Sequence, residues 1–196
     1  MAAIVVPFRG AGGKQRLGPL PDGARAALSL AMLADVLAAC SVVGETYVVT
    51  ADEDGARVAR ELDATLVDDP GDGQGAAVAA GLAAAGDRRV LVVNADVPCV
   101  VPHDLRTLEA ATNEIPSSGV AARDGTTNAL GLSSPSLFAP LFGDGSAERF
   151  REHAHELGVD VVPAVIPNLC DDVDSLEDLE RLELRVGPRT LAARAR

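Results

Sequence analysis

The sequence is poor in aromatic residues and in positive charge, and each shortage excludes a class of protein. Its 196 residues include no tryptophan, one tyrosine and four phenylalanines, although 47% of the chain is hydrophobic. A sizeable core must therefore be built mainly from alanine, valine and leucine. The formal net charge is −12, which argues against binding to nucleic acid, because polymer binders usually carry a basic face. A local basic pocket for a small anion remains compatible with this charge.

Cysteines and long apolar runs are also scarce. Cys40, Cys99 and Cys170 are odd in number, are widely spaced and include no C-x-x-C pair, so neither a zinc site nor a disulfide framework is indicated. We therefore expect a reduced, cytoplasmic location. The apolar start at 1–8 is short and broken by proline, unlike a signal peptide. No uninterrupted apolar run approaches the roughly 18 residues of a membrane span, and we expect no membrane partner.

What the sequence does contain is a regular alternation of apolar runs and helical patterns. Continuous apolar runs, typical of strands buried on both faces, occupy 2–6, 46–50, 64–69 and 89–96. Helical patterns occupy 22–40, 52–63, 73–86, 102–112, 146–158 and 175–185. A strand pair is expected at 118–124 and 128–134, and a further strand at 159–165. This order predicts an α/β fold with a doubly wound, mostly parallel sheet.

The length favours one domain, which we expect to span 1–184. The remaining residues, 185–196, form a basic stretch, and their composition favours a mobile tail over a lid that covers an anionic ligand. The whole protein is expected to be a monomer or a homodimer.

The glycine-rich loop "VPFRGAGGKQRLGPL" follows the first predicted strand and fails the tests for two common phosphate loops. A Walker loop needs glycine where Phe8 stands and a hydroxyl residue after Lys14, where this chain has Gln15. A dinucleotide fingerprint that starts at Gly10 needs its third glycine at position 15, which is again Gln15. Neither a P-loop NTPase nor a Rossmann dehydrogenase is therefore indicated.

The same loop could still hold phosphates in another way. Gly12 and Gly13 let backbone N–H groups approach an anion closely, and Arg9, Lys14 and Arg16 can neutralise a triphosphate. The alternative is a mobile loop whose basic residues pair with the acidic surface.

Acidic residues at two distant places predict a metal site. Asp96 ends a buried strand, and Asp172 and Asp174 stand two apart in "LCDDVDS". If that segment is extended, both carboxylates point to one face and Asp171 faces away. Mg²⁺ usually takes one or two carboxylates and completes its shell with phosphate oxygens and water, so one or two ions could be held against a triphosphate. The alternative is an acidic turn in which Asp174 or Ser175 caps the following helix.

Two further segments are candidates for binding a small anion. "DGTTNALGL" places Thr126, Thr127 and Asn128 at the start of a strand, and "LFGDGSAERF" places Gly143 and Ser146 at the start of a helix. Hydroxyl groups and free N–H groups at a helix N-terminus bind anions well. A plain helix cap at Ser146 is the alternative, and it is compatible with the binding role.

Taken in order, these motifs resemble one family. The order is a basic glycine loop with "K-x-R-L", the apolar helix "AMLADVL", then "D-x-P", "G-T-x-N-A-L", "F-G-x-x-S" and "D-x-D-[ST]-x-x-D-L". The chain resembles, over nearly its whole length, the 2-phospho-L-lactate or phosphoenolpyruvate guanylyltransferases of coenzyme F420 biosynthesis. These are relatives of the molybdenum-cofactor guanylyltransferases, with a Rossmann-like, GT-A-like fold.

The resemblance implies a reaction in which the acceptor's phosphate attacks the α-phosphorus of GTP and expels pyrophosphate. It implies Mg²⁺ as cofactor, GTP as co-substrate and only small-molecule partners. The resemblance implies that the metal ligands are Asp96, Asp172 and Asp174, and that the acceptor is bound by Thr126, Thr127, Asn128, Gly143 and Ser146. It implies that the GTP phosphates are acted on by two catalytic residues, Lys14 and Arg16. It also implies that the nucleotide site includes Arg9, Gly12, Gly13, Gln74 and Gly75. Because a phosphate nucleophile is already ionised, no general base is needed, and catalysis consists of positioning and charge neutralisation.

The chain departs from the family pattern at three places. Arg9 stands where the family usually has lysine, "Q-G" at 74–75 replaces "L-N", and Phe150 stands where histidine is frequent. The alanine- and arginine-rich composition is typical of actinobacteria, and it favours phosphoenolpyruvate over 2-phospho-L-lactate as the acceptor.

Three other readings stay open at this point. One is a nucleotidyltransferase that acts on a molybdopterin-type or sugar-phosphate acceptor. Another is a glycosyltransferase, although that family places its D-x-D motif mid-chain. The third is a non-catalytic nucleotide-binding protein, against which the three intact acidic positions argue.

Overall fold

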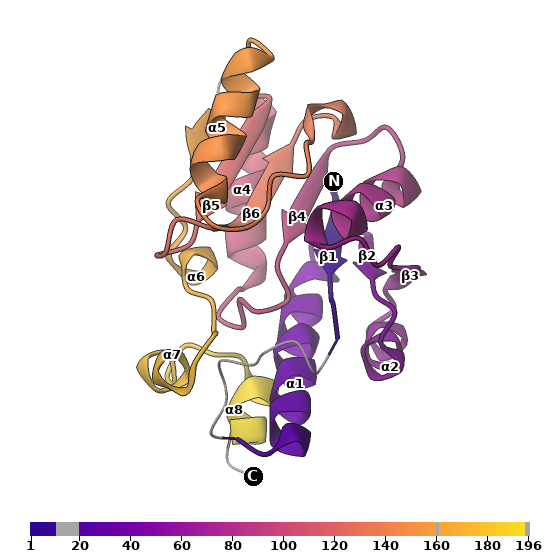
Figure 1. Ribbon diagram of the computed structural model, residues 1–196, viewed down its shortest axis with the longest axis vertical. Coiled ribbons are helices and arrows are strands. Elements are labelled where there is room, and N and C mark those ends of the chain that lie inside the picture. The colour runs from indigo at the N-terminus through magenta and orange to yellow at the C-terminus, as the bar shows by residue number, and fades with distance from the viewer. Residues whose placement is uncertain (11–19, 160, 195–196) are drawn as a thin grey trace.

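A seven-stranded sheet runs through the middle of the protein (Figure 1). The computed structural model describes residues 1–10, 20–159 and 161–194. The strands are β1 (Ala3–Pro7), β2 (Thr46–Val49), β3 (Thr65–Val67), β4 (Val90–Val93), β5 (Ser117–Ala121), β6 (Thr127–Leu132) and β7 (Val161–Pro163). Their order across the sheet is β3-β2-β1-β4-β6-β5-β7. Strand β6 runs antiparallel to β4 and β5, and the other neighbouring pairs are parallel.

Helices cover both faces of this sheet, because successive side chains of a strand point to opposite sides. Ile4 and Val6 of β1 share one core with four helices, whereas Ala3 and Val5 share the other core with two helices. The first set is α1 (Asp22–Cys40), α2 (Glu53–Glu61), α4 (Pro102–Glu114) and α6 (Pro167–Cys170), and the second is α3 (Gln74–Ala85) and α5 (Ser146–Glu156). The prediction of a doubly wound, mostly parallel sheet is confirmed.

Helix α1 is the longest helix and packs on both of its apolar sides. Leu33 and Leu37 enter the core under the sheet, and Leu28 and Met32 enter a smaller core near the C-terminal helices. By length and composition α1 could cross a membrane, but 56% of its most apolar stretch is buried inside the protein. Such burial is typical of the core helix of a globular protein.

The last third of the chain contains short helices that the sequence patterns did not predict or predicted too long. They are the 3₁₀ turn η2 (Pro135–Leu137), α6 (Pro167–Cys170), α7 (Leu176–Arg181) and α8 (Pro188–Arg194). Strand β4 ends at Val93, three residues before the predicted end, so Asp96 lies in the loop that follows.

Helix α8 corrects the expectation of a mobile tail after residue 184. It packs along α1, where the buried Asp35 carboxylate accepts hydrogen bonds from the backbone N–H groups of Arg189 (3.2 Å) and Thr190 (2.8 Å). A carboxylate at a helix N-terminus satisfies N–H groups that have no partner inside the helix and is favoured by the helix dipole. Any side chain at Gly187 would place its Cβ 2.3 Å from the Asp35 carboxyl carbon. Composition predicted the basic character of this segment but not its docking.

We expect Asp35→Ala to destabilise the protein by about 1–3 kcal/mol, because it leaves the buried N–H groups of α8 without an acceptor. The free energy of unfolding, measured by denaturant titration, tests this. The surface variant Asp54→Ala is the matched control and is expected to change stability by less than about 0.5 kcal/mol. Equal stability of Asp35→Ala and the unmodified protein would show that α8 does not depend on this carboxylate.

Candidate functional site

A pocket of about 700 Å³ opens at the carboxyl ends of β1, β3 and β4. This is the edge at which doubly wound sheets bind ligands, and it lies at the change of strand order between β1 and β4. Because β6 is antiparallel, its first residues, Thr127 and Asn128, reach the same edge. The backbone N–H of Asn94, just after β4, donates to the Asn128 carbonyl over 3.0 Å.

The structure brings most of the sequence-predicted site residues into this pocket. Those that line it are Arg9, Gln74, Asp96, Thr126, Thr127, Asn128, Gly143, Ser146, Asp172 and Asp174. Gly75 lines an adjoining pocket of about 540 Å³ that shares Arg9 and Gln74 with the first. Gly12, Gly13, Lys14 and Arg16 lie outside the described residues, and the roles assigned to them stay predictions.

Gly75 also has a packing reason to be glycine. A Cβ at this position would lie 2.5 Å from the Cβ of Pro140. Helix α3 can therefore approach the segment before α5 only because residue 75 has no side chain. This close approach is sufficient to explain why the chain has glycine here.

Three carboxylates meet in the pocket. One oxygen from each of Asp96, Asp172 and Asp174 lies within 4.8 Å of the other two. The arrangement is built by the backbone, since the N–H of Val173 donates to the Asp96 carbonyl over 2.9 Å. The Val173 side chain is fully buried, so its two neighbours in the chain turn the opposite way, into the pocket. Carboxylate oxygens at this spacing fit a hard divalent cation such as Mg²⁺, with room for phosphate oxygens.

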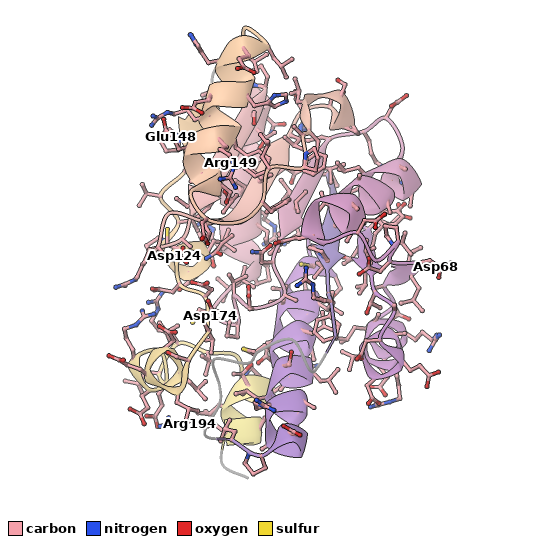
Figure 2. The ribbon with its side chains drawn as sticks, viewed as in Figure 1. Asp68, Asp124, Glu148, Arg149, Asp174 and Arg194 are labelled. Atoms are coloured by element: carbon pink, nitrogen blue, oxygen red, sulfur yellow. The ribbon has the colours of Figure 1, made fainter. Side chains whose placement is uncertain are left out.

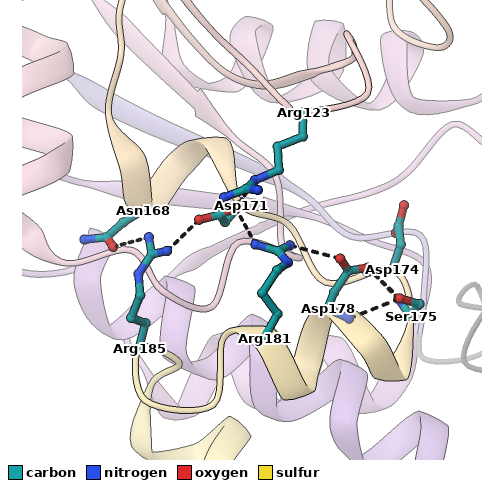
Figure 3. Close-up of polar contacts among 8 residues, drawn as sticks. All are labelled: Arg123, Asn168, Asp171, Asp174, Ser175, Asp178, Arg181 and Arg185. Carbon is teal, nitrogen blue, oxygen red and sulfur yellow. Dashed lines mark hydrogen bonds and ion pairs between the residues drawn. The ribbon is translucent and has the colours of Figure 1, made fainter.

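Asp171 faces away from the pocket, as the alternation predicts. Its carboxylate is 2% exposed and accepts hydrogen bonds from Arg123 (2.6 Å), Arg181 (2.7 Å) and Arg185 (2.6 Å), which converge on it in Figure 3. Burial alone would raise the pKa of this carboxyl. The hydrogen bonds from the three guanidinium groups outweigh burial and lower the pKa below its ordinary value.

The helix cap and the carboxylate cluster coexist. Ser175 is the N-cap of α7 and forms a capping box with Asp178, in which each side chain accepts a hydrogen bond from the other residue's backbone N–H. Asp174 is therefore not the capping residue, and its carboxylate lines the pocket instead. The two interpretations of this segment, a carboxylate cluster and a helix cap, therefore apply to different residues: Ser175 caps α7, and Asp172 and Asp174 line the pocket.

A second wall of the pocket carries hydroxyl and amide groups. Ser146 donates to the hydroxyl of Thr127 over 3.0 Å, and both residues are buried. Asn128 is 1% exposed, and its side-chain nitrogen has no hydrogen-bond partner among the described residues. An unsatisfied buried donor costs about 1–3 kcal/mol. Because Asn128 lines the pocket, this N–H is a candidate donor to a ligand oxygen.

Arg149, which is labelled in Figure 2, is hydrogen-bonded to the loop between η2 and α5. Its guanidinium group donates to the backbone carbonyls of Leu141 (2.9 Å) and Phe142 (3.2 Å) and also to that of Asp144. Helix α5 begins at Ser146, and its N-cap is Gly145, which has a left-handed backbone with φ 67°. The interpretation of Ser146 as the cap is therefore wrong by one residue.

Phe150, which departs from the family pattern, does not line the pocket. Its ring packs against those of Phe142 and Phe138, with centroid distances of 5.2 and 6.4 Å. Phe142 does line the pocket. At position 150, where the family frequently has histidine, this chain thus has an apolar ring that packs against the pocket-lining Phe142.

Sequence reasoning missed several pocket residues, and Asn94 is the most instructive. Its side-chain N–H donates to the Thr127 carbonyl over 3.1 Å, and its side-chain oxygen accepts from Gln74 over 2.7 Å. The signal was present, because Asn94 stands two residues before Asp96 in "NAD" and so could share its face.

The negative charge of this pocket was also underestimated from the sequence. The described part of the chain contributes one guanidinium, from Arg9, and six carboxylates to the pocket: Asp69, Asp96, Asp124, Asp144, Asp172 and Asp174. Figure 2 labels two of them, Asp124 from the β5–β6 turn and Asp174 from the loop before α7. An anionic ligand can bind here only if cations offset these charges.

The fold and this pocket define a nucleotide-handling transferase of the α/β class. A family profile described as the MobA-like NTP transferase domain matches residues 16–194. Phosphoenolpyruvate guanylyltransferase of Streptomyces coelicolor is 39% identical over 98% of this chain and 95% of its own length. That of Conexibacter woesei is 38% identical over 95% of this chain and 89% of its own. The chain therefore belongs to the MobA-like NTP transferases and, within them, to the phosphoenolpyruvate guanylyltransferase family, as its motifs indicated.

Solved structures show the same fold at low sequence identity. A nucleotide-diphospho-sugar transferase from Desulfovibrio desulfuricans superposes with a TM-score of 0.80 at 17% identity over 99% of this chain and 94% of that chain. The molybdopterin-guanine dinucleotide biosynthesis protein A of Archaeoglobus fulgidus gives a TM-score of 0.56 at 17% identity over 93% and 97% of the two chains. These likenesses show the fold, and the family relationship identifies the protein as a nucleotidyltransferase enzyme.

We expect Asp172→Asn and Asp174→Asn each to weaken binding of Mn²⁺, used as a paramagnetic substitute for Mg²⁺, by about tenfold or more, the equivalent of about 1.4 kcal/mol. Each change removes one charged oxygen ligand from the cluster. Titration followed by electron paramagnetic resonance measures the affinity. Asp144→Asn is the matched control, because it removes a pocket carboxylate outside the cluster. Equal weakening in all three variants would mean that only overall charge matters.

Proposed function

We propose that the protein transfers the GMP group of GTP to the phosphate of phosphoenolpyruvate and releases pyrophosphate. The observation that supports this most directly is one pocket that holds both a cluster of three carboxylates and the buried amide N–H of Asn128, which has no partner among the described residues. The names of the relatives support guanine and phosphoenolpyruvate as the substrates. We infer from the family that the product enters coenzyme F420 biosynthesis in the cytoplasm.

The chemistry needs no proton acceptor from the protein. An oxygen of the acceptor's phosphate forms a bond to the α-phosphorus of GTP, the bond from that phosphorus to the bridging oxygen breaks, and pyrophosphate leaves with the electron pair. The attacking phosphate is already ionised near neutral pH. Burial raises the pKa of the Cys40 thiol to about 12 and that of Cys99 to about 11, so neither offers a thiolate nucleophile.

Charge neutralisation is the main task of the nucleotide half of the site. Asp96, Asp172 and Asp174 would hold one or two Mg²⁺ ions, which would withdraw negative charge from the phosphate oxygens. Arg9 is exposed in the pocket and makes no ion pair within the described part of the chain, so its guanidinium is available to the triphosphate. Lys14 and Arg16 would add positive charge on the evidence of the sequence alone.

The acceptor half is the wall formed by Thr126, Thr127, Asn128, Gly143 and Ser146. Asn128 would donate its unpartnered N–H to a carboxylate or phosphate oxygen of phosphoenolpyruvate. The Thr127 hydroxyl accepts from Ser146 and so has its own proton to donate to the second anionic group. A small acid with two anionic ends therefore suits this wall better than a neutral sugar does.

The choice of base would depend on Gln74, whose amide has a fixed direction. A backbone carbonyl only accepts hydrogen bonds, so Asn94 must turn its N–H to Thr127 and its oxygen to Gln74. Gln74 must then donate to Asn94, which leaves its own oxygen as an acceptor where the two pockets meet. Guanine offers N–H donors at N1 and N2, whereas adenine has an acceptor at N1.

The assay that tests the proposal measures pyrophosphate release with each nucleoside triphosphate, Mg²⁺ and a panel of acceptors. We expect release with GTP and phosphoenolpyruvate. Release only with 2-phospho-L-lactate, a sugar phosphate or a molybdopterin would replace the acceptor. Absence of release with every combination, in a protein that still binds GTP, would favour a non-catalytic nucleotide-binding protein.

We expect Gln74→Leu to reduce the preference for GTP over ATP by about 3- to 10-fold, the equivalent of one hydrogen bond of about 0.5–1.5 kcal/mol. The ratio of kcat/KM for the two nucleotides, with phosphoenolpyruvate saturating, is the measurement. A loss of kcat/KM that is equal for both nucleotides would show that Gln74 packs against the ligand without reading the base.

A further inference from the structure

We propose that the ion pair between Arg123 and Asp171 fixes the acceptor wall relative to the metal ligands. The inference rests on the proposed function, which assigns these two parts of the pocket. Asp171 directly precedes Asp172 in the carboxylate cluster, and Arg123 lies in the turn between β5 and β6, which leads into the acceptor wall. The Arg123 Nε donates to an Asp171 carboxylate oxygen over 2.6 Å. Arg123 is thus a positioning residue outside the pocket lining.

The pair joins two segments that are 48 residues apart in the sequence. The Asp171 side chain is 3% exposed, whereas that of Arg123 is 67% exposed. The carboxylate is therefore held in one place by its surroundings, and the arginine reaches in from a surface turn (Figure 3). A charge-assisted hydrogen bond to a buried anion is stronger and more directional than a surface ion pair.

The turn that carries Arg123 is closed by hydrogen bonds of its own and touches both elements of the acceptor wall. The N–H of Ala122 donates to the Thr126 carbonyl over 2.8 Å, and Asp124 accepts from the backbone N–H and the hydroxyl of Thr126. On its other side, the Gly125 carbonyl accepts from the N–H of Ala147 in α5 over 3.2 Å. A movement of Arg123 would therefore be transmitted to Thr126 and to the start of α5.

The chain offers a matched control in Arg185. Its guanidinium also donates to the Asp171 carboxylate over 2.6 Å, and it has a second bond to Asn168 over 2.8 Å. Arg185 follows α7, and neither of its hydrogen bonds within the described part of the chain reaches the β5–β6 turn. Loss of either arginine removes one charged hydrogen bond from the same carboxylate, but only Arg123 belongs to the acceptor side.

The experiment compares Arg123→Gln and Arg185→Gln in the full chain by steady-state kinetics. We expect Arg123→Gln to raise the KM for phosphoenolpyruvate by roughly tenfold, which corresponds to about 1.4 kcal/mol, and to leave the KM for GTP within about twofold. Arg185→Gln should leave both KM values near those of the unmodified protein and lower only the melting temperature. An unchanged KM for phosphoenolpyruvate in Arg123→Gln, or equal effects of the two variants, would overturn the proposal.

A measurement without turnover separates this inference from the proposed function. Amide hydrogen exchange should become faster across 122–128 in Arg123→Gln and stay unchanged there in Arg185→Gln. If the unmodified protein releases no pyrophosphate with phosphoenolpyruvate, the proposed function fails, while the exchange experiment still tests the link. If exchange across 122–128 is the same in both variants, the link itself is wrong.

Discussion

The site depends on one backbone hydrogen bond, from the N–H of Val173 to the carbonyl of Asp96. It joins the loop after β4 to a segment far along the chain, and the buried side chain of Val173 holds the joined segment against the core. Asp172 and Asp174 must then face Asp96. Three carboxylates so close together repel one another, and a divalent cation bound between them would reduce that repulsion.

The reversed direction of β6 also determines which side chains line the pocket. In a fully parallel sheet the start of that strand would lie at the opposite edge, and Thr127 and Asn128 would be far from the carboxylates. Because β6 is antiparallel to β4, Asn94 can bond Thr127 on one side and Gln74 on the other. The two sides of the pocket that we propose for the nucleotide and the acceptor are thereby connected through the Asn94 side chain.

Continuous apolar runs in the sequence were sufficient to predict the buried strands. The period-two geometry of an extended chain was sufficient to predict that Asp171 faces away from Asp172 and Asp174, since both predictions depend only on local sequence. The role of Asn94 could not be predicted in this way, because its partners come from two other elements whose register is set by tertiary structure. The expectation that residues 188–194 belong to a mobile tail was wrong for a similar reason. Their basic side chains are conspicuous in the sequence, whereas the contact that holds them is a backbone bond to a carboxylate in α1. The direction of Phe150 likewise depends on neighbouring rings that are distant in sequence.

The bond between Asp35 and Thr190 spans 155 residues, and this distance has a consequence for how the protein is made. The apolar side of α1 that carries Leu28 and Met32 is covered by residues near 179–186 and by α8. During synthesis α1 therefore emerges long before its cover, and that apolar surface stays open until the ribosome has produced nearly the whole described chain. Long-range contacts of this kind slow folding and leave intermediates prone to aggregation. Premature termination in the last helices would thus leave a protein whose sheet can form but whose first helix stays partly uncovered.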